Sequence, residues 1–285
     1  MKKNDRLFKL VFLSPVVIYT TLLIFLPLVY ILFLSFCQND SYGGIIYDFT
    51  LSNYFTIFDI TYLRIFLQSC LIALIATFIC ICISYPFALF LREKKEKTRN
   101  LVTKLVMVPF LTNSLIRTYG WIVLLRKNGI INSGLISLNL TDTPLNLMYN
   151  NIGVIIGMSY TLLPFMILPV CSAVFKIDNS LIEASHDLGA GPIKTFKNVI
   201  VPQTLSGVFN GSLMVFIPAI GYFFIADILG GGKAMIIGNL IKNQFLTARN
   251  WPLGAAISIF LIIVTFVLVK IYRRLGGKLD ELGGA

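Results

Sequence analysis

The chain alternates long apolar stretches with short polar segments along most of its length. A helix needs about 20 mostly apolar residues to cross the hydrocarbon core of a membrane, and six stretches meet that requirement. They cover residues 10–36, 65–91, 101–125, 152–175, 204–229 and 252–272. The pattern predicts an all-α polytopic membrane protein with one transmembrane domain over residues 1–285, a first span and five further spans within 65–272.

The amino-acid composition also indicates a membrane protein. Hydrophobic residues make up 56% of the 285 positions and charged residues 13%, against about 25% charged residues in soluble domains. The mean hydropathy is +0.82. A soluble enzyme of this length would have to bury more apolar surface than one domain can enclose, so this class is excluded.

The positive charge is grouped between the apolar stretches. The net charge is +11, and 17 of the 24 Lys and Arg residues fall in four groups. Because cytoplasmic loops retain Lys and Arg, these groups predict cytoplasmic termini and cytoplasmic loops at 92–100 and 176–203. The charge therefore indicates topology and not nucleic-acid binding. The groups are Lys2, Lys3, Arg6 and Lys9; Arg92, Lys94, Lys95, Lys97, Arg99 and Lys104; Lys176, Lys194 and Lys197; and Lys270, Arg273, Arg274 and Lys278.

The N-terminal segment starts like a secretory signal, with basic residues before an apolar run. That run, from Leu10 to Phe36, is about twice the length of a signal's apolar core, and no A-x-A cleavage site follows it. We expect a first span that is retained.

Prolines interrupt two of the predicted spans. Pro164 and Pro169 lie in the fourth, and Pro218 lies near Gly221 in the fifth. A proline removes a backbone donor and kinks a helix, and such breaks mark hinges and substrate cavities in transporters. Ordinary kinks without a function are the alternative.

The sequence contains no catalytic motif. The only histidine, His186, has no Cys or Ser partner in a recognisable arrangement, and neither H-E-x-x-H nor G-x-S-x-G occurs. The glycine-rich run from Leu229 to Ala234 is not a phosphate loop, because Lys233 is followed by alanine. The five cysteines are expected to be small packing residues. We expect no catalytic residue, metal or cofactor, and an integral membrane enzyme is the least supported class.

A short polar helix is predicted between the fourth and fifth spans. Ser180 and Glu183 have the S-x-x-E spacing of a capping box, and Gly189 supplies a left-handed end. The predicted helix covers residues 181–188. An isolated helix of this length is marginal in water, so a partner should dock against it. A surface turn that links two spans is the alternative.

The same segment resembles the EAA signature loop of ABC-importer permeases. That signature reads E-A-A, three residues, glycine, nine residues, then aliphatic-x-aliphatic-Pro, and the sequence from Glu183 to Pro202 follows it. Ser185 takes the place of the third alanine. The resemblance implies a coupling helix that sits in a groove of the cytoplasmic ATPase subunit. It assigns this role to Ser180, Glu183, Ala184, Ser185, Asp187, Leu188, Gly189 and Pro202, and it leaves His186 without one.

Three further segments, 108–121, 160–169 and 237–256, resemble the permeases of spermidine/putrescine importers. The resemblance implies the type I (MetI-like) ABC importer permease fold, in the bacterial cytoplasmic membrane and in contact with its lipid. It also implies a non-catalytic subunit that imports a polyamine by alternating access. The implied partners are a second, homologous permease, two ATPase subunits that hydrolyse ATP, and an external polyamine-binding protein.

A polyamine is a multivalent cation, so its path should offer carboxylates, carbonyls and aromatic faces. Asp227 is a candidate because it is ionisable at membrane depth; alternatively it caps a helix or pairs with Lys233 or Lys242. Arg117 shares a helix face with Asn113 and would repel a polyamine, so a structural salt bridge or a contact with the binding protein is expected. The predicted pathway residues are Asp227, Tyr222, Phe223, Asn113, Ser114, Tyr119, Trp121 and Phe110.

Other functions stay open at this point. A permease of the same architecture could carry an amino-acid derivative, thiamine or a ferric ion. A channel or an ion-gradient transporter would need no ATPase, so it would not co-purify with a nucleotide-binding subunit.

Overall fold

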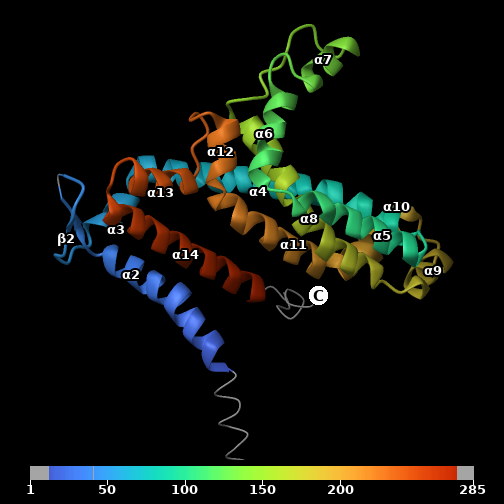
Figure 1. The fold of residues 1–285 in the computed structure, drawn as a ribbon. Coiled ribbons are helices and arrows are strands. Elements are labelled where there is room, and N and C mark those ends of the chain that lie inside the picture. Colours follow the sequence, from blue (N-terminus) through green and yellow to red (C-terminus); the bar gives the residue numbers. More distant parts are fainter. Residues whose placement is uncertain (1–12, 41, 275–285) are drawn as a thin grey trace, which may run out of the picture. The chain divides into compact units, whose positions relative to one another are not determined.

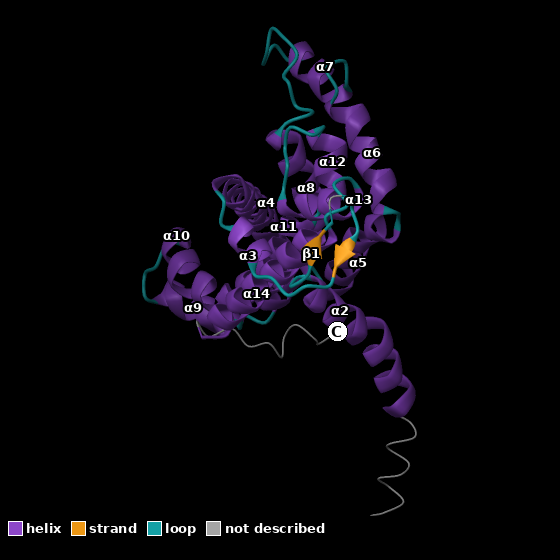
Figure 2. Cartoon of the chain, turned by 90° about the vertical axis from the view of Figure 1, so that its left-hand side faces the viewer, coloured by secondary structure: helices purple, strands orange, loops and turns teal. Residues whose placement is uncertain are grey.

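The computed structural model describes residues 13–40 and 42–274. Within them, almost every element is a helix, and one short hairpin is the exception (Figure 2). The chain divides into two compact units. Unit 1 combines residues up to Leu63 with Leu240–Val264, and unit 2 combines Arg64–Asn239 with the residues from Thr265 onward.

Unit 1 has a small core at the end of its first helix. Leu34, Cys37 and Ala255 are buried there, and the buried Asn53 amide donates hydrogen bonds to the carbonyls of Ser35 (3.1 Å) and Cys37 (2.8 Å). Its elements are a π-helical turn (Thr21–Phe25), α2 (Leu26–Leu34), β1 (Gln38–Asn39), β2 (Ile45–Ile46), α3 (Ser52–Ile57), most of α13 (Ile237–Leu246) and most of α14 (Trp251–Arg274). The two strands pair antiparallel.

Unit 2 contains the long helices drawn from cyan to orange in Figure 1. Its elements are α4 (Ile60–Arg92), α5 (Glu96–Met107), a 3₁₀ turn (Val108–Leu111), α6 (Ser114–Leu125), α7 (Ile130–Ser137), α8 (Asn151–Phe175), α9 (Asn179–Asp187), α10 (Pro192–Thr195), a π-helical turn (Phe196–Ile200), α11 (Val201–Gly221) and α12 (Phe223–Gly230). α8 is central, because it contacts α5, α6, α11 and α12.

The packing of α8 on α11 depends on two glycines. Gly207 and Gly211 are four residues apart, and a Cβ at Gly207 would lie 2.7 Å from the Pro169 carbonyl oxygen. At Gly211 it would lie 2.6 Å from the Met166 sulfur. Small residues at this spacing let helices approach closely in membranes. The side chains of α8 that share this buried stripe are Met158, Leu162, Met166, Val170 and Val174.

Five helices in the described residues are long and apolar enough to cross a membrane. They are Leu13–Leu34, Ile60–Arg92, Asn151–Phe175, Pro192–Gly221 and Trp251–Ile271. The predicted span at 204–229 is shifted, because the continuous helix starts at Pro192 and α11 ends at Gly221, before a break at Tyr222. α12 then starts as a separate helix.

The predicted third span, 101–125, is wrong as a single helix. α5 ends at Met107, a 3₁₀ turn containing Pro109 follows, and Thr112 is extended. α6 then starts afresh, with Asn113 as its N-cap. The length of the apolar stretch does not reveal this break, because the residues around it are mostly apolar.

Candidate functional site

The predicted short polar helix is present as α9, but its start differs from the prediction. The N-cap is Asp178, whose carboxylate accepts a hydrogen bond from the Ser180 backbone N–H at 3.0 Å. The prediction that Ser180 caps the helix is therefore wrong, because Ser180 lies inside it. This hydrogen bond, assisted by the Ser180 side chain, lowers the pKa of Asp178 from its ordinary value.

The predicted end of the helix is confirmed. Gly189 has φ +76°, a left-handed conformation that glycine adopts without a Cβ penalty. The Ala190 N–H donates to the Ser185 carbonyl at 3.0 Å and the Gly189 N–H donates to the His186 carbonyl at 2.8 Å. These are the two hydrogen bonds of a Schellman motif, so α9 has a fixed end.

Ser185 ties α9 to the start of the next long helix. Its hydroxyl oxygen lies 2.8 Å from that of Thr195, in a buried hydrogen bond, and it also donates to the Ile182 carbonyl at 2.9 Å. Thr195 ends α10, which continues through the π-helical turn into α11. An alanine at position 185 could not make this bond.

Arg92 ties the other end of α9 to α4. Its guanidinium donates to the Asn179 side-chain oxygen at 2.6 Å and to the Ile177 carbonyl at 3.2 Å. Further along α4, the Tyr85 hydroxyl is hydrogen-bonded to Thr204, and the Tyr85 ring meets Phe196 edge to face at 5.4 Å. α9 is therefore connected to two long helices through side chains.

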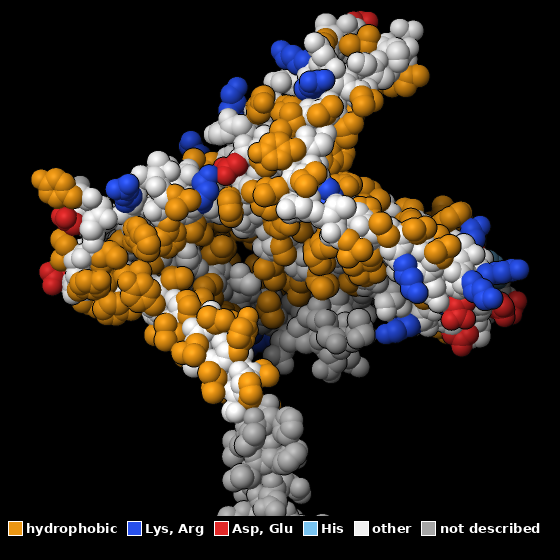
Figure 3. Space-filling model, viewed as in Figure 1, with side chains coloured by type: hydrophobic (Ala, Val, Ile, Leu, Met, Phe, Trp, Pro, Cys, Tyr) orange, Lys and Arg blue, Asp and Glu red, His pale blue; other side chains and the backbone are white. Residues whose placement is uncertain are grey.

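The outer surface of this region is exposed and mixed in character. Charged side chains of both signs gather at the end of unit 2 that holds α9 and α10 (Figure 3). Two apolar side chains stand among them, since Leu188 is 88% exposed and Ile193 is 82% exposed. Of the residues predicted to couple to the ATPase, the exposed ones are Ser180, Glu183, Ala184, Asp187, Leu188, Gly189 and Pro202. His186 is exposed too.

A second group of side chains lies around the break between α5 and α6, within the predicted third span. Asn113 caps α6, because its side-chain oxygen accepts from the Leu115 N–H at 2.8 Å. Four residues on, the Arg117 guanidinium carbon lies 5.2 Å from the centre of the Phe110 ring and 5.9 Å from that of Tyr160. Arg117 therefore contacts two aromatic rings, and the expected salt bridge or contact with the binding protein stays a prediction.

Further rings extend this group, which we call the Arg117 cluster. Phe110 meets Phe165 edge to face at 4.9 Å, and Trp121 meets Tyr160 at 5.3 Å. The cluster consists of Phe110, Arg117, Trp121, Tyr160 and Phe165, from the 3₁₀ turn, α6 and α8. Of the other predicted residues on α6, Ser114 is partly buried, and Tyr119 is 59% exposed and lies outside these ring contacts.

The break between α11 and α12 is held by Gly238 and Asn239, which lie in the first turn of α13 and belong to unit 2. A Cβ at Gly238 would lie 2.3 Å from the Gly221 carbonyl oxygen, so only glycine permits this approach. Beside it, the buried Asn239 amide donates to the Phe223 carbonyl at 3.0 Å and to the Asp227 carboxylate at 2.6 Å. The sequence prediction missed Asn239, which links the break to Asp227.

The predicted aromatic residues near Asp227 are only partly sheltered. The Tyr222 and Phe224 ring centres lie 4.8 Å apart, with the rings tilted by 49°. Arg117 is close enough to interact electrostatically with Tyr222. Phe223 is 41% exposed. Asp227 is itself exposed. The two breaks in the helices therefore meet around Arg117 and Tyr222, through the contact of α12 with α6.

The glycine-rich run has a structural role. Gly231 has φ +55°, and a Cβ there would lie 2.4 Å from the Tyr149 ring. The Tyr149 N–H donates to the Leu229 carbonyl at 2.8 Å. Glycine is needed where the turn passes under this ring, which explains the run without any phosphate.

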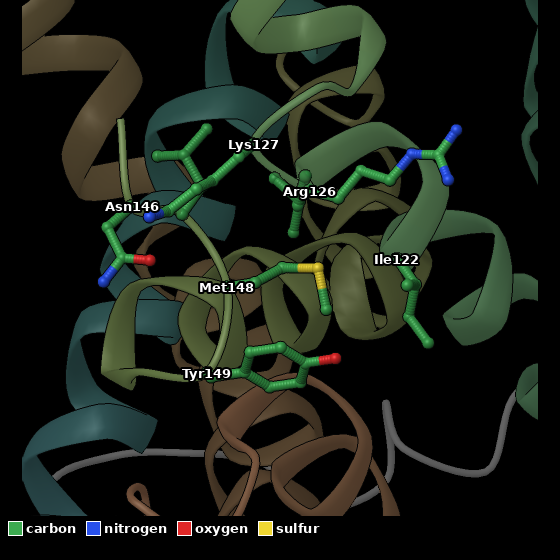
Figure 4. A pocket seen from close by; sticks show the side chains of 8 residues that line it. Ile122, Arg126, Lys127, Asn146, Met148 and Tyr149 are labelled. Carbon is green, nitrogen blue, oxygen red and sulfur yellow. The ribbon is translucent and has the colours of Figure 1, made fainter. Parts of the chain in front are cut away.

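A cavity of about 300 Å³ lies between the end of α6 and the segment before α8. Met148 and the Tyr149 ring occupy its middle, and Lys127 and Asn146 lie on one side of it (Figure 4). Its apolar lining and its two basic residues, Arg126 and Lys127, do not suit a cation. None of the predicted pathway residues lines it. Its lining residues are Ile122, Leu125, Arg126, Lys127, Asn146, Leu147, Met148 and Tyr149.

The chain is similar to curated permeases over nearly the whole of both chains. The chain is 43% identical over 279 residues to the spermidine/putrescine transport system permease protein PotB of Salmonella typhimurium (strain SL1344), covering 98% of this chain and 97% of the relative. It is 43% identical to the protein of that name from Escherichia coli K12, covering 92% and 96%. The Haemophilus influenzae protein of that name is 41% identical, covering 94% and 95%.

Solved structures show the same fold. A chain of a bacterial ABC transporter that imports the acidic polysaccharide alginate matches with a TM-score of 0.75 at 16% identity, covering 96% of both chains. A chain of the MetNI methionine ABC transporter matches with a TM-score of 0.54 at 17% identity, covering 75% of this chain and 93% of that one. Residues 5–281 match the family described as "Binding-protein-dependent transport system inner membrane component". The chain therefore belongs to this family of inner-membrane permeases of ABC importers, and its fold is the helical, MetI-like permease fold.

Proposed function

We propose that the chain is the permease subunit of an ATP-driven importer for spermidine or putrescine. The observation that carries the proposal is the identity of 41–43% with permeases named for these substrates, over nearly the whole of both chains. The Arg117 cluster supports it, because aromatic faces attract organic ammonium groups.

We propose α9 as the helix that docks on a cytoplasmic ATPase subunit. Its ends are fixed by Asp178 and Gly189, and its exposed surface presents Leu188 beside charged side chains. Exposed apolar side chains rimmed by polar residues mark protein interaction sites. Movement of the docked helix would reach α11 through Ser185 and Thr195 and α4 through Arg92.

We propose that substrate passes the two breaks in the helices. Discontinuous helices form the substrate sites of many transporters because their ends and unwound segments offer polar backbone groups inside the membrane. The break at residues 108–113 and the break at Tyr222 both lie next to Arg117. Asp227, held by Asn239, supplies a carboxylate near the second break.

The proposed cycle is alternating access. An external polyamine-binding protein delivers the substrate, ATP closes two cytoplasmic ATPase subunits, and the permease pair, made with a homologous second permease, opens alternately to each side. In this orientation both termini, whose outermost residues lie outside the described residues, are cytoplasmic. The subunit itself carries out no chemistry.

Reconstitution tests this function. The assembled permeases, ATPase and binding protein in liposomes should take up labelled spermidine or putrescine, with ATP hydrolysis that rises when loaded binding protein is added. An excess of an amino-acid derivative, thiamine or a ferric salt should not compete. ATP hydrolysis without polyamine uptake would remove the substrate claim, and a chain that assembles with no ATPase would favour a channel or an ion-gradient transporter.

A further inference from the structure

Arg117 occupies a position in which a fixed cation is unexpected on the proposed path of a cationic substrate. It lies half-buried one turn into α6, near the positive end of a helix dipole. Its Nε is buried and has no hydrogen-bond partner among the described residues. The guanidinium carbon instead lies over the rings of Phe110 and Tyr160, at 5.2 and 5.9 Å from the ring centres.

These aromatic faces form a cation site that is already filled. Phe110 and Tyr160 are themselves fixed by edge-to-face contacts with Phe165 and Trp121, so the two faces persist when Arg117 moves. A ring face attracts an alkylammonium in the same way as a guanidinium. Two like charges cannot share so small a site without strong repulsion, so occupation is exclusive.

We propose that Arg117 is a resident cation that occupies the polyamine-binding faces of Phe110 and Tyr160 until a substrate ammonium displaces it. The inference rests on the proposed function and names one binding site on its path. While Arg117 is in place, its charge opposes the entry of small inorganic cations. A polyamine displaces it because a second ammonium group binds elsewhere on the path while the first takes the rings.

Opposite effects of two substitutions distinguish this role from a structural one. Arg117→Gln leaves the rings vacant, so labelled spermidine should bind more tightly to the assembled permeases and ATPase without the binding protein. Phe110→Leu removes one face and should weaken the same binding. Each change should be about two- to thirty-fold, the ordinary strength of one cation–π contact. Arg117→Lys, which restores a cation, should return binding towards the wild-type value.

Ion leakage gives a second, independent measurement. Liposomes with the Arg117→Gln transporter should lose rubidium ions several-fold faster without ATP than wild-type liposomes, and those with Arg117→Lys should not. Arg126→Gln is the matched control, because Arg126 is an exposed residue at the end of the same helix. It should change neither binding nor leakage.

The outcomes separate the two proposals. Unchanged or weaker spermidine binding in Arg117→Gln, with normal assembly, would overturn the role of Arg117 while leaving the importer intact. The same holds if Arg117→Gln and Phe110→Leu shift binding in the same direction. If the wild-type assembly neither binds nor imports a polyamine, the proposed substrate fails, whatever the rubidium measurement shows.

Discussion

The hydroxyl oxygens of Ser185 and Thr195 lie 2.8 Å apart, and both side chains are buried. This bond joins α9 to α10 across the turn at Gly189, in addition to the backbone hydrogen bonds that end α9. It explains why a serine can occupy the place of the third alanine in the EAA signature. The polar side chain has a partner that ties the docking helix to the α10–α11 segment.

We predict that Ser185→Ala reduces the number of polyamine molecules imported per ATP several-fold, while ATP hydrolysis continues. Removing one partner leaves the buried Thr195 hydroxyl unpaired, at a cost of about 1–3 kcal/mol, and loosens the link between α9 and α11. Uptake and ATP hydrolysis measured in the same liposomes test this. Thr195→Val should have a similar effect, and the double variant should be no worse than either single one if the two act through one bond.

Gly189→Trp is predicted to uncouple ATP hydrolysis from uptake without preventing membrane insertion. No atom lies within 4 Å of a Cβ built at Gly189, so the indole would project into the space where the ATPase is proposed to dock. The left-handed backbone adds about 1–2 kcal/mol of strain for any residue with a Cβ. Gly189→Asn, which tolerates this conformation better, separates strain from bulk. Normal coupling in the Trp variant would contradict the docking assignment.

We predict that the Asp178 side chain stabilises the first turn of α9 more than the Ser180 side chain does. Asp178→Ala should raise amide hydrogen exchange in the first turn of α9, whereas Ser180→Ala should change it less, because the Ser180 contribution to the cap comes mainly from its backbone N–H. The lowered pKa of Asp178 fixes the sign of the pH effect. The cap is fully formed above the ordinary carboxyl pKa of about 3.9 and is lost as the pH falls through the lower value in the folded protein. Equal exchange in both variants would contradict the assigned cap.

Most helices follow from the sequence, but their breaks do not. Apolar length reveals long helices because a membrane span needs little else, and Asn151–Phe175 differs from its predicted range by one residue at the start. The break at residues 108–113 is hidden because apolar residues surround it, and Asn113 can equally face a pore or cap a helix. The outcome depends on Pro109 and the Asn113 cap acting together.

The same limit applies to the site. The stop at Gly189 is local, so a motif predicts it. The cap at Asp178 competes with a plausible alternative at Ser180, two residues along the chain. The bond from Ser185 to Thr195 requires a turn geometry that spacing does not give. Gly207 and Gly211 could have been found, since their spacing is that of a close helix contact. No motif in the sequence identifies Asn239, because its role depends on its hydrogen bonds to Phe223 and Asp227 in the fold.

Gly238→Ala is predicted to reduce both thermal stability and uptake. A Cβ at this position would lie 2.3 Å from the Gly221 carbonyl oxygen and 2.8 Å from its carbon, so the backbone at the α11–α12 break must move. Forcing a methyl group into such a packed contact typically costs about 1–3 kcal/mol. Gly120→Ala on α6 is the matched control, because no atom lies within 4 Å of its Cβ position. Thermal unfolding of the purified transporter and uptake should distinguish the two variants.

Asp227→Asn and Asn239→Ala separate the charge of Asp227 from its support. The asparagine oxygen can still accept the hydrogen bond from Asn239, so Asp227→Asn removes charge with little change in structure. We expect it to weaken polyamine binding several-fold at unchanged stability. Asn239→Ala instead removes the hydrogen bonds of Asn239 with the Phe223 carbonyl, the Ile236 N–H and the Asp227 carboxylate, at a cost of about 1–3 kcal/mol, and should lower both stability and binding. If Asp227→Asn binds and imports polyamines as the wild type does, Asp227 serves α12 and α13 structurally and the carboxylate of the path lies elsewhere.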